Sequence, residues 1–306
     1  MSTGNPVSQT PASPEPANPP QSLLERLADS TQQFVQVVVG SHRKPPRRFK
    51  SLLNGTWLGH PFHPVMIVVP IGSWLLTALL DIIWLASPAS VVWAARGAEI
   101  IVGVGILGAL GAVAAGLTDW SDADGAVHRI GFIHAIFNSS AVLLYIVSFV
   151  LRLTQPAGNS VPGAILGFIG AGCIIYAATL GGEMVFVKGQ GVNHTAWESG
   201  SEDYEAVLPV ESVAENKLYR VMASGVPVVL LRQGLQFYAL SATCPHAGGP
   251  LDEGELQGDV VQCPWHGSRF RLRDGRVLTG PATSRAARYE VRVSHGQVEL
   301  KRVSEH

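Results

Sequence analysis

Two short runs near the C-terminus each place a cysteine and a histidine close together: "CPHAGGPL", which begins at Cys244, and "CPWHGSRF", which begins at Cys263. One residue separates Cys244 from His246, and two residues separate Cys263 from His266. Two thiolates and two imidazoles suit a structural zinc ion, which favours tetrahedral sulfur and nitrogen ligands. They also suit a [2Fe-2S] cluster with thiolates on one iron and histidines on the other. The prolines and glycines of both runs predict tight, converging loops whose backbone amides approach cluster sulfurs.

The flanks of these runs carry a more specific pattern. C-x-H followed by C-x-x-H, within these two octapeptides, resembles the Rieske iron-sulfur family over about residues 204–303. "TGPA" at 279–282 is similar to the proline loop that this family places beside its cluster, so we expect Pro281 there. A four-ligand motif with both flanks in place favours the iron-sulfur cluster over zinc.

The resemblance implies a role for each ligand. Cys244 and Cys263 would hold the inner iron, and His246 and His266 would hold the outer, solvent-facing iron through their imidazoles. Because histidines replace thiolates on that iron, the cluster is less negative and its reduction potential lies above that of plant-type ferredoxins. The implied activity is one-electron transfer, with the two exposed histidines as the exit point.

Four positions can be compared with the high-potential Rieske proteins of respiratory complexes: three differ and one agrees. Gly249 and Trp265 stand where those proteins carry two further cysteines, so no disulfide can staple the loops. Ser268 is retained where they hydrogen-bond a bridging sulfide, but Phe270 replaces their tyrosine and removes a second hydrogen bond to sulfur. Fewer donors stabilise the reduced cluster less, so we predict a potential nearer the ferredoxin and oxygenase Rieske groups.

An oxygenase is not expected. Rieske oxygenases add a large domain in which two histidines and a carboxylate hold a mononuclear iron, and the sequence leaves no room for one after residue 303. We therefore expect an electron carrier or an oxidoreductase subunit with no evident small-molecule substrate site. Its partner would be a redox protein or a quinone.

Short strands must position the two loops. Runs such as "VPVVLL", "VVQC" and "YEVRV" are rich in β-branched and aromatic residues and are separated by turn signals. They predict a small all-β sandwich or barrel at 204–303. The polar, Gly/Ser-containing segment at 193–203 reads as a linker ahead of it.

The rest of the chain reads as a membrane protein, with 47% hydrophobic residues, only 15% charged residues and a mean hydropathy of +0.23. Each apolar stretch is near the length of about 20 residues that crosses a bilayer as a helix. The expected spans of this four-helix transmembrane domain, at 56–192, are 62–86, 96–117, 130–151 and 162–186. The net charge of −1 gives no indication of a nucleic-acid partner.

The N-terminal region has two expected parts. Residues 1–20 are rich in Pro, Ser, Thr and Asn and are predicted to be disordered. Residues 21–55 are predicted to form an amphipathic helix and a basic juxtamembrane segment.

The distribution of Lys and Arg predicts the orientation of the bundle. One side carries Arg43, Lys44, Arg47, Arg48, Lys50, Arg129 and Lys188, and the other carries Arg96 and Arg152. Basic residues stay in the cytoplasm. We therefore expect a multi-pass cell-membrane protein whose N-terminus and Rieske-like domain are both cytoplasmic.

The membrane segment is also a candidate site. "GHPFHPVMIVVPIG", "AGLTDW", "RIGFIHAIFN" and "LGGEMVF" resemble a four-helix bacterial membrane family of unknown function. His60, His63, Asp119, His134 and Glu183 should lie near one face, and ionisable residues inside a membrane usually mark a site. Two facing histidines can ligate a b-type haem, hold a metal ion with the carboxylates, or bind a quinone. Alternatively, the histidines hydrogen-bond headgroups, water or helix ends.

Two functions follow from these observations. The first is a membrane-anchored one-electron carrier that exchanges electrons with a haem, metal or quinone site in the bundle. The second is a non-catalytic redox sensor, in which the state of the cluster alters a contact made by the linker or the N-terminal tail. Turnover of electrons separates the two.

Overall fold

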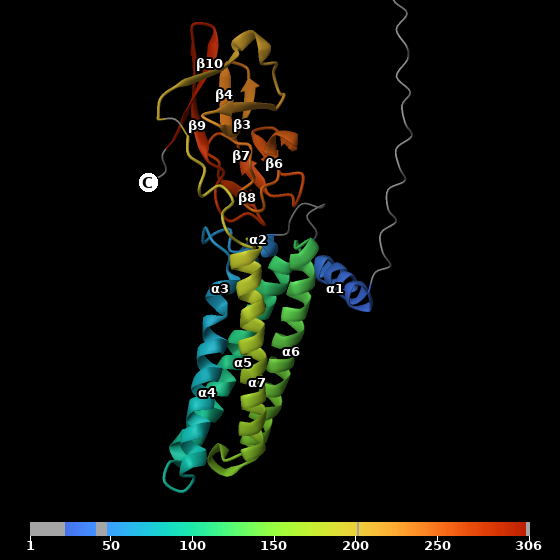
Figure 1. Ribbon diagram of the computed structural model, residues 1–306, viewed down its shortest axis with the longest axis vertical. Coiled ribbons are helices and arrows are strands. Elements are labelled where there is room, and N and C mark those ends of the chain that lie inside the picture. Colours follow the sequence, from blue (N-terminus) through green and yellow to red (C-terminus); the bar gives the residue numbers. More distant parts are fainter. Residues whose placement is uncertain (1–21, 41–47, 201, 304–306) are drawn as a thin grey trace, which may run out of the picture.

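The computed structural model describes residues 22–40, 48–200 and 202–303. It has two parts stacked along its longest axis, a helical bundle and a β domain (Figure 1). This confirms the predicted fold class. The tail expected at 1–20, and Arg43, Lys44 and Arg47 of the basic cluster, lie outside the described residues.

The bundle contains four long helical segments within the described part of the chain, each long and apolar enough to cross a membrane. They are α3 (His63–Met66) continued by α4 (Val68–Ala86), α5 (Val92–Trp120), α6 (Gly125–Leu153), and α7 (Val161–Gly182) with one further turn at Glu183–Val187. Several extend beyond the apolar stretches seen in the sequence. Hydropathy locates only the hydrocarbon-spanning part, whereas backbone hydrogen bonding carries the helix on into the polar interface.

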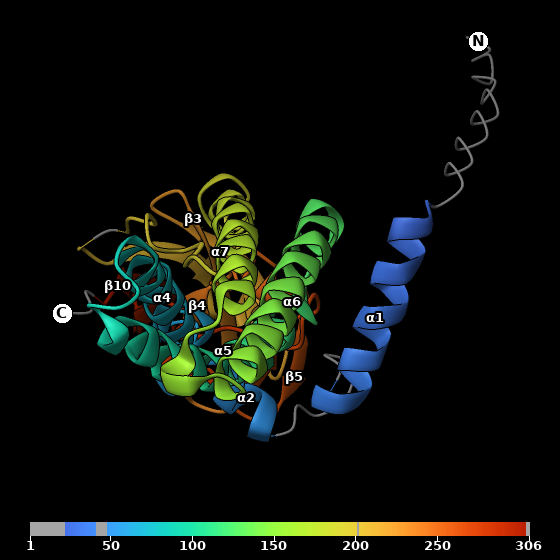
Figure 2. The ribbon, with the colours of Figure 1, turned by 90° about the horizontal axis from the view of Figure 1, so that it is seen from below.

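The helices pack so that α4 and α6 lie at opposite corners. α4 packs along α5 and α6 along α7, and the α5–α6 and α4–α7 contacts close the ring (Figure 2). Trp74 of α4 and Tyr145 of α6 stack across the centre with their ring centroids 4.1 Å apart. A side chain at Gly105 would lie 2.2 Å from Trp74, and one at Gly170 would lie 2.7 Å from Tyr145. The small residues of α5 and α7 therefore make room for this aromatic pair.

Two basic residues counted as flanking charges are instead buried. Arg152 donates to both carboxylate oxygens of Asp81, at 2.8 and 2.6 Å, and neither side chain is exposed. Lys50 of α2 (Arg48–Asn54) is bonded at 2.7 Å to Asp122 in the loop before α6. The interpretation of Arg152 and Lys50 as juxtamembrane charges was wrong, because each neutralises a buried carboxylate within the fold. Arg96 and Arg152 were the two flanking charges predicted on the side opposite the β domain, and of these two only Arg96 keeps that role.

The β domain consists of two antiparallel sheets. The larger has the order β1 (Glu205–Pro209), β10 (Gln297–Arg302), β9 (Arg288–Ser294), β4 (Gln236–Ser241), β3 (Val226–Gln233) and β2 (Tyr219–Ala223). The smaller has the order β5 (Glu255–Gln257), β6 (Val260–Gln262), β7 (Arg269–Arg271) and β8 (Val277–Thr279). Two hairpins turn at Ser224–Gly225 and His295–Gly296, where both residues have positive φ, as a type I′ turn requires.

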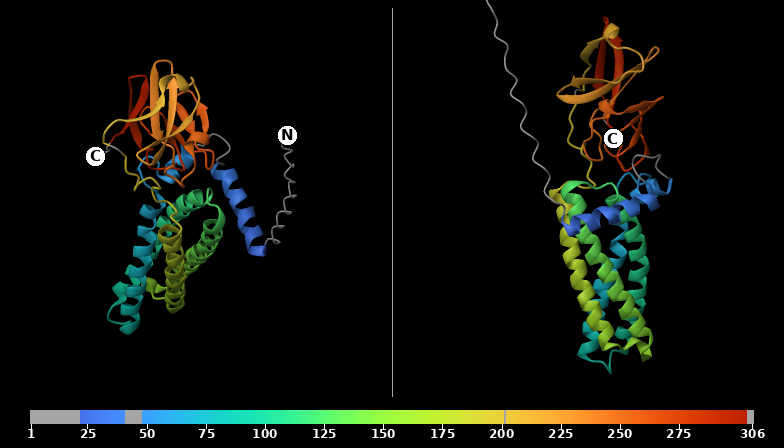
Figure 3. Two further views of the ribbon diagram at one scale, coloured as in Figure 1. Left: turned by 45° about the horizontal axis from the view of Figure 1, so that its top comes forward. Right: turned by 90° about the vertical axis from the view of Figure 1, so that its right-hand side faces the viewer.

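The smaller sheet brings its loops down onto the bundle (Figure 1). A side chain at Gly280 would lie 3.0 Å from Thr56 and 3.1 Å from Asn54, so the proline loop packs on the segment around the end of α2. The segment expected as a linker also makes contacts, because His194 N–H donates to the Pro245 carbonyl at 3.0 Å. Helix α1 (Leu23–Val39) lies across the same end of the bundle (Figure 3). The ends of the bundle and of the β domain therefore meet directly.

Candidate metal centre

The two predicted ligand loops are built alike. In the first, Cys244 N–H donates to Gly249 O at 2.8 Å, and Cys244 O accepts from Gly248 N–H at 2.8 Å. The second loop repeats both bonds at the same spacing from Cys263. Each cysteine sulfur also accepts from the backbone N–H groups two and three residues further along the chain. The sequence folds this way because a proline follows each cysteine and a glycine with positive φ stands four residues after it.

The four side chains form two pairs. Cys244 and Cys263 are buried, with their thiols hydrogen-bonded to each other. This hydrogen bond lowers the pKa of Cys263 to about 6 and raises the pKa of Cys244 well above its usual range, because the two sulfurs share one negative charge. The rings of His246 and His266 lie with centroids 4.9 Å apart and planes at 82°. Burial, and then the neighbouring imidazole of His266, lower the pKa of His246 to about 3, which keeps it neutral.

The donors fit a [2Fe-2S] cluster with unlike ends. His246 Nδ1 is buried and has no hydrogen-bond partner, a costly state for a polar atom that a bond to iron would relieve. Two sulfurs lie on one side and two imidazoles on the other, and the backbone N–H groups already point at the sulfurs. When bound, the cluster supplies one-electron oxidation and reduction, and its sulfur hydrogen bonds help to set the potential.

Comparison with known proteins agrees with this geometry. The chain matches the Rieske [2Fe-2S] domain at residues 203–290 and a predicted membrane protein family, DUF2231, at residues 59–194. Ferredoxin CarAc of Metapseudomonas resinovorans is 42% identical over 72 residues, which are 24% of this chain and 67% of that protein. The chain belongs to the Rieske [2Fe-2S] family. The predicted fusion of a Rieske domain to a membrane domain is therefore confirmed. The match also supports a [2Fe-2S] cluster, and not a structural zinc ion, at the four ligands.

Further relatives are also ferredoxins. The 3-phenylpropionate/cinnamic acid dioxygenase ferredoxin subunit of Escherichia coli K12 is 36% identical over 91 residues, which are 29% of this chain and 85% of that protein. A solved complex of reduced oxygenase and oxidised ferredoxin in carbazole 1,9a-dioxygenase aligns with 34% of this chain and 100% of that chain, at 32% identity and a TM-score of 0.32. The match to the Rieske family and the ferredoxin relatives show that the Rieske domain holds a [2Fe-2S] cluster and has an electron-transfer role, beside a membrane domain.

The positions that depart from the respiratory Rieske proteins lie around the predicted cluster. A side chain at Gly249 would lie 2.8 Å from Cys263 Sγ and 3.1 Å from the ring of Trp265. Gly249 and Trp265, which stand in place of the stapling cysteines, are therefore in contact. Ser268 Oγ accepts from Ala282 N–H at 2.9 Å and so ties the second ligand loop to the proline loop. Phe270 is fully buried in the core below.

The outer histidines of the Rieske domain face the membrane domain. His266 Nε2 lies 2.9 Å from Oδ2 of Asp124, the residue that precedes α6. The His266 side chain is 12% exposed, and His246 and Pro281 line a cavity that continues into the bundle. The expectation of a solvent-facing iron does not match this arrangement, because the docked bundle covers that side. No sequence pattern indicated Asp124, which is 142 positions from His266.

The cavity between the two parts has a volume of about 690 Å³. It collects His60, His63, Asp119 and His134, four of the five residues predicted as a membrane site. Glu183 does not join them, because it lies exposed on the outside of the turn after α7. The expectation that Glu183 shares this site does not match the structure, because Glu183 begins a π-helical turn at Glu183–Val187 and is exposed there.

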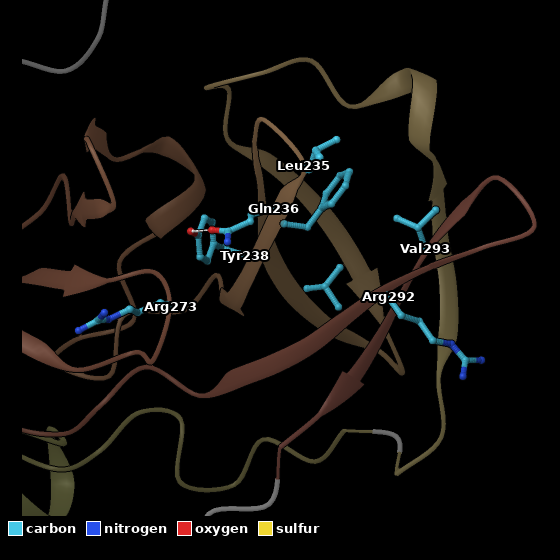
Figure 4. A pocket seen from close by; sticks show the side chains of 8 residues that line it. Leu235, Gln236, Tyr238, Arg273, Arg292 and Val293 are labelled. Atoms are coloured by element: carbon cyan, nitrogen blue, oxygen red, sulfur yellow. Dashed lines mark hydrogen bonds between the residues drawn. The ribbon is translucent and has the colours of Figure 1, made fainter.

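A second hollow lies on the β domain away from the cluster. It is lined by Leu235, Gln236, Phe237, Tyr238, Arg273, Val291, Arg292 and Val293. Arg273 and Arg292 point in different directions, and Leu235 stands at its rim (Figure 4). No cysteine or histidine lines it among the described residues.

Proposed function

We propose that this protein is a membrane-anchored one-electron carrier whose cluster is held by Cys244, Cys263, His246 and His266. The observation that carries the proposal is the 2.9 Å contact between His266 and Asp124, since it joins the outer end of the cluster site to the membrane domain. His246 borders the cavity that enters the bundle. Electrons would therefore pass between the cluster and the membrane domain at this interface.

A soluble redox protein is the proposed partner on the other side. Trp265 lies next to a predicted ligand, and the residue is 52% exposed. Exposed aromatic residues are common anchors of protein interfaces. The curated relatives are ferredoxins and ferredoxin subunits of dioxygenases, which supports a partner that takes or gives single electrons.

We propose a cytoplasmic Rieske domain. Arg129 lies near the start of α6 and Lys188 directly follows the turn after α7, and both remain flanking charges within the described residues. Basic residues near the helix ends stay in the cytoplasm. Protease added outside intact cells should leave a C-terminal epitope tag uncut, and cleavage of the tag in such cells would reverse the orientation.

Electron transfer through the cluster can be tested directly. Purified full-length protein in detergent is reduced by a soluble one-electron donor, and the visible bleaching of the cluster and its reoxidation by a quinone or haem acceptor are followed in time. His266→Ala should abolish the signal and the transfer. His295→Asn is the matched control, because His295 lies in the β9–β10 turn with positive φ, which asparagine tolerates. Equal turnover in His266→Ala would refute the carrier.

A redox sensor is the second candidate, and the same contact favours it. His266 bonds to Asp124 at the start of α6, so a change of cluster charge acts on the junction of the two domains. A sensor would exchange electrons slowly and change its protease pattern at residues 193–203 upon reduction. Fast turnover with no such change would reject it.

A further inference from the structure

Two histidines face each other inside the bundle, apart from the Rieske cluster. His63 begins the α3 segment and His134 lies on α6, at opposite corners of the four-helix ring. Their ring centroids are 6.4 Å apart and their planes are at 82°. Both line the cavity of about 690 Å³. The cluster loops supply neither residue, so this pair needs its own explanation.

Both rings are held in the same way. His63 Nδ1 donates to the carbonyl of Ala112 on α5 at 2.8 Å, and His134 Nδ1 donates to the carbonyl of Ala177 on α7 at 2.8 Å. In each neutral ring Nε2 then carries the lone pair. A backbone carbonyl that accepts from the second ring nitrogen is the usual support of a metal-bound histidine.

The separation of the rings also suits a shared metal ion. A metal bonded to an imidazole nitrogen at about 2 Å lies roughly 3 Å from the centre of that ring, so one metal between two rings holds their centroids roughly 6 Å apart. The observed 6.4 Å agrees. Within the described residues of the bundle, no further histidine, cysteine or acidic side chain is arranged with His63 and His134 for a metal ion. Haem iron suits a site of two ligands, because the porphyrin supplies four nitrogens.

The cavity has the shape and polarity of a haem site. Its inner part is apolar, with Ile71, Trp74, Val142 and Ile174 among its lining. Glycines let both rings lie close to the neighbouring helices: a side chain at Gly116 would lie 2.8 Å from His63, and one at Gly181 would lie 3.5 Å from His134.

The mouth of the cavity is polar. Asn54 is only 1% exposed, and neither its amide nitrogen nor its oxygen has a hydrogen-bond partner. Its side chain lines the cavity together with Thr283 and Ser284 of the Rieske domain. An unpaired buried amide is costly unless a ligand satisfies it. A haem carries two propionates at one edge, and this end of the cavity offers them donors.

We propose that His63 and His134 are the axial ligands of one b-type haem, with its propionates toward Asn54. The assignment rests on the bundle's own residues and does not depend on the proposed carrier function. Because His246 borders the same cavity, the haem would also be the membrane-side partner of the cluster. Ferric haem that takes one electron from the reduced cluster becomes ferrous, and the cluster becomes oxidised, so no further reactant is needed.

Haem content and spectrum test the assignment. Full-length protein, expressed with a haem precursor and purified in detergent, should contain about one haem b per chain by pyridine haemochrome, with a six-coordinate low-spin spectrum. His63→Ala and His134→Ala should each lower the haem content at least tenfold while the cluster signal persists. His128→Ala is the matched control: His128 also lies on α6, but its ring stacks on Trp120 and does not line the cavity.

Conservative variants keep the test valid if alanine impairs folding. His63→Met and His134→Met supply a thioether ligand and should retain haem with a raised potential and a shifted spectrum. Wild-type protein without haem after supplemented expression would overturn the proposal, and so would co-purified quinone in place of haem. Full haem content in both alanine variants would overturn it as well. Wild-type protein with full haem but no cluster signal would count against the carrier function alone.

Discussion

The contact of Asp124 with His266 joins the two domains and can be tested by a single substitution. The carboxylate is 84% exposed, whereas the imidazole is 12% exposed, so the bond lies at the edge of the interface. A carboxylate that accepts from a ligand histidine makes that ligand more basic and favours the oxidised metal. This contact should therefore lower the potential of the cluster.

Asp124→Asn is expected to raise the midpoint potential by roughly 20–60 mV, the equivalent of about 0.5–1.4 kcal/mol for one electron. An EPR-monitored redox titration of the purified protein measures the shift. Glu299→Gln serves as the control, because Glu299 pairs with Arg292 on the β9–β10 hairpin. An unchanged or lower potential in Asp124→Asn would show that the contact does not tune the cluster.

Ser268 and Phe270 should shift the potential in opposite directions. Ser268→Ala removes a hydroxyl near the predicted cluster and leaves the buried Ala282 N–H without its acceptor, at a cost of about 1–3 kcal/mol in stability. We expect a lower potential in this variant. Phe270→Tyr adds a hydroxyl and should raise the potential from a wild-type value near the lower end of the Rieske range, about −150 to +300 mV. The same redox titration measures all three midpoint potentials. A wild-type potential well into the positive range would contradict the expected low value.

At the level of elements, small residues determine how the helices of the bundle approach. α5 and α7 present glycines where the aromatic pair of α4 and α6 stacks. In lipid there is little hydrophobic drive between helices, so close van der Waals packing carries much of the association. The floor of the cavity, formed by Trp74, depends on this packing.

Gly105→Ala should destabilise the bundle by about 1–3 kcal/mol, because its methyl group would lie 2.2 Å from Trp74 Nε1 and the ring must move. Unfolding in detergent, followed by tryptophan fluorescence, measures the loss. Gly172→Ala is the paired control on α7, since a side chain there meets no atom within 4 Å. If both variants unfold alike, close packing at Gly105 is not what holds the aromatic pair.

For the whole molecule, the buried Lys50–Asp122 pair holds the junction of the domains. Lys50 comes from α2, which also packs on the proline loop of the Rieske domain, and Asp122 comes from the α5–α6 loop. A buried charge that loses its partner destabilises its surroundings strongly, by about 3–5 kcal/mol. Docking of the Rieske domain should therefore depend on this pair.

Lys50→Met should remove the ammonium group that neutralises the buried carboxylate of Asp122 and loosen the contact of the domains, so that the cluster becomes accessible to solvent. The rate at which a chelator bleaches the cluster is then expected to rise severalfold. Lys217→Met is the control, because Lys217 lies over Tyr219 on the β domain. Equal bleaching rates in the two variants would mean that the pair does not maintain the interface.

The sequence alone was sufficient for the fold class, the four helices and the cluster loops. Each pair of predicted ligands lies within four positions, so backbone geometry in one loop already brings a cysteine beside a histidine. Helices that cross a bilayer are recognised by their length and hydropathy. The ligand spacing and the hydropathy are both properties of short, continuous segments.

Only the tertiary structure decided which residues meet across the chain. Lipid is as apolar as the bundle core, so hydropathy does not tell which face of a helix turns inward. For this reason the sequence did not predict the outward direction of Glu183, the burial of Arg152 against Asp81, or the orphaned amide of Asn54. The contact of His266 with Asp124 depends on how two domains dock. That docking depends on the complementary shapes of two folded surfaces, and the spacing of residues along the chain does not predict it.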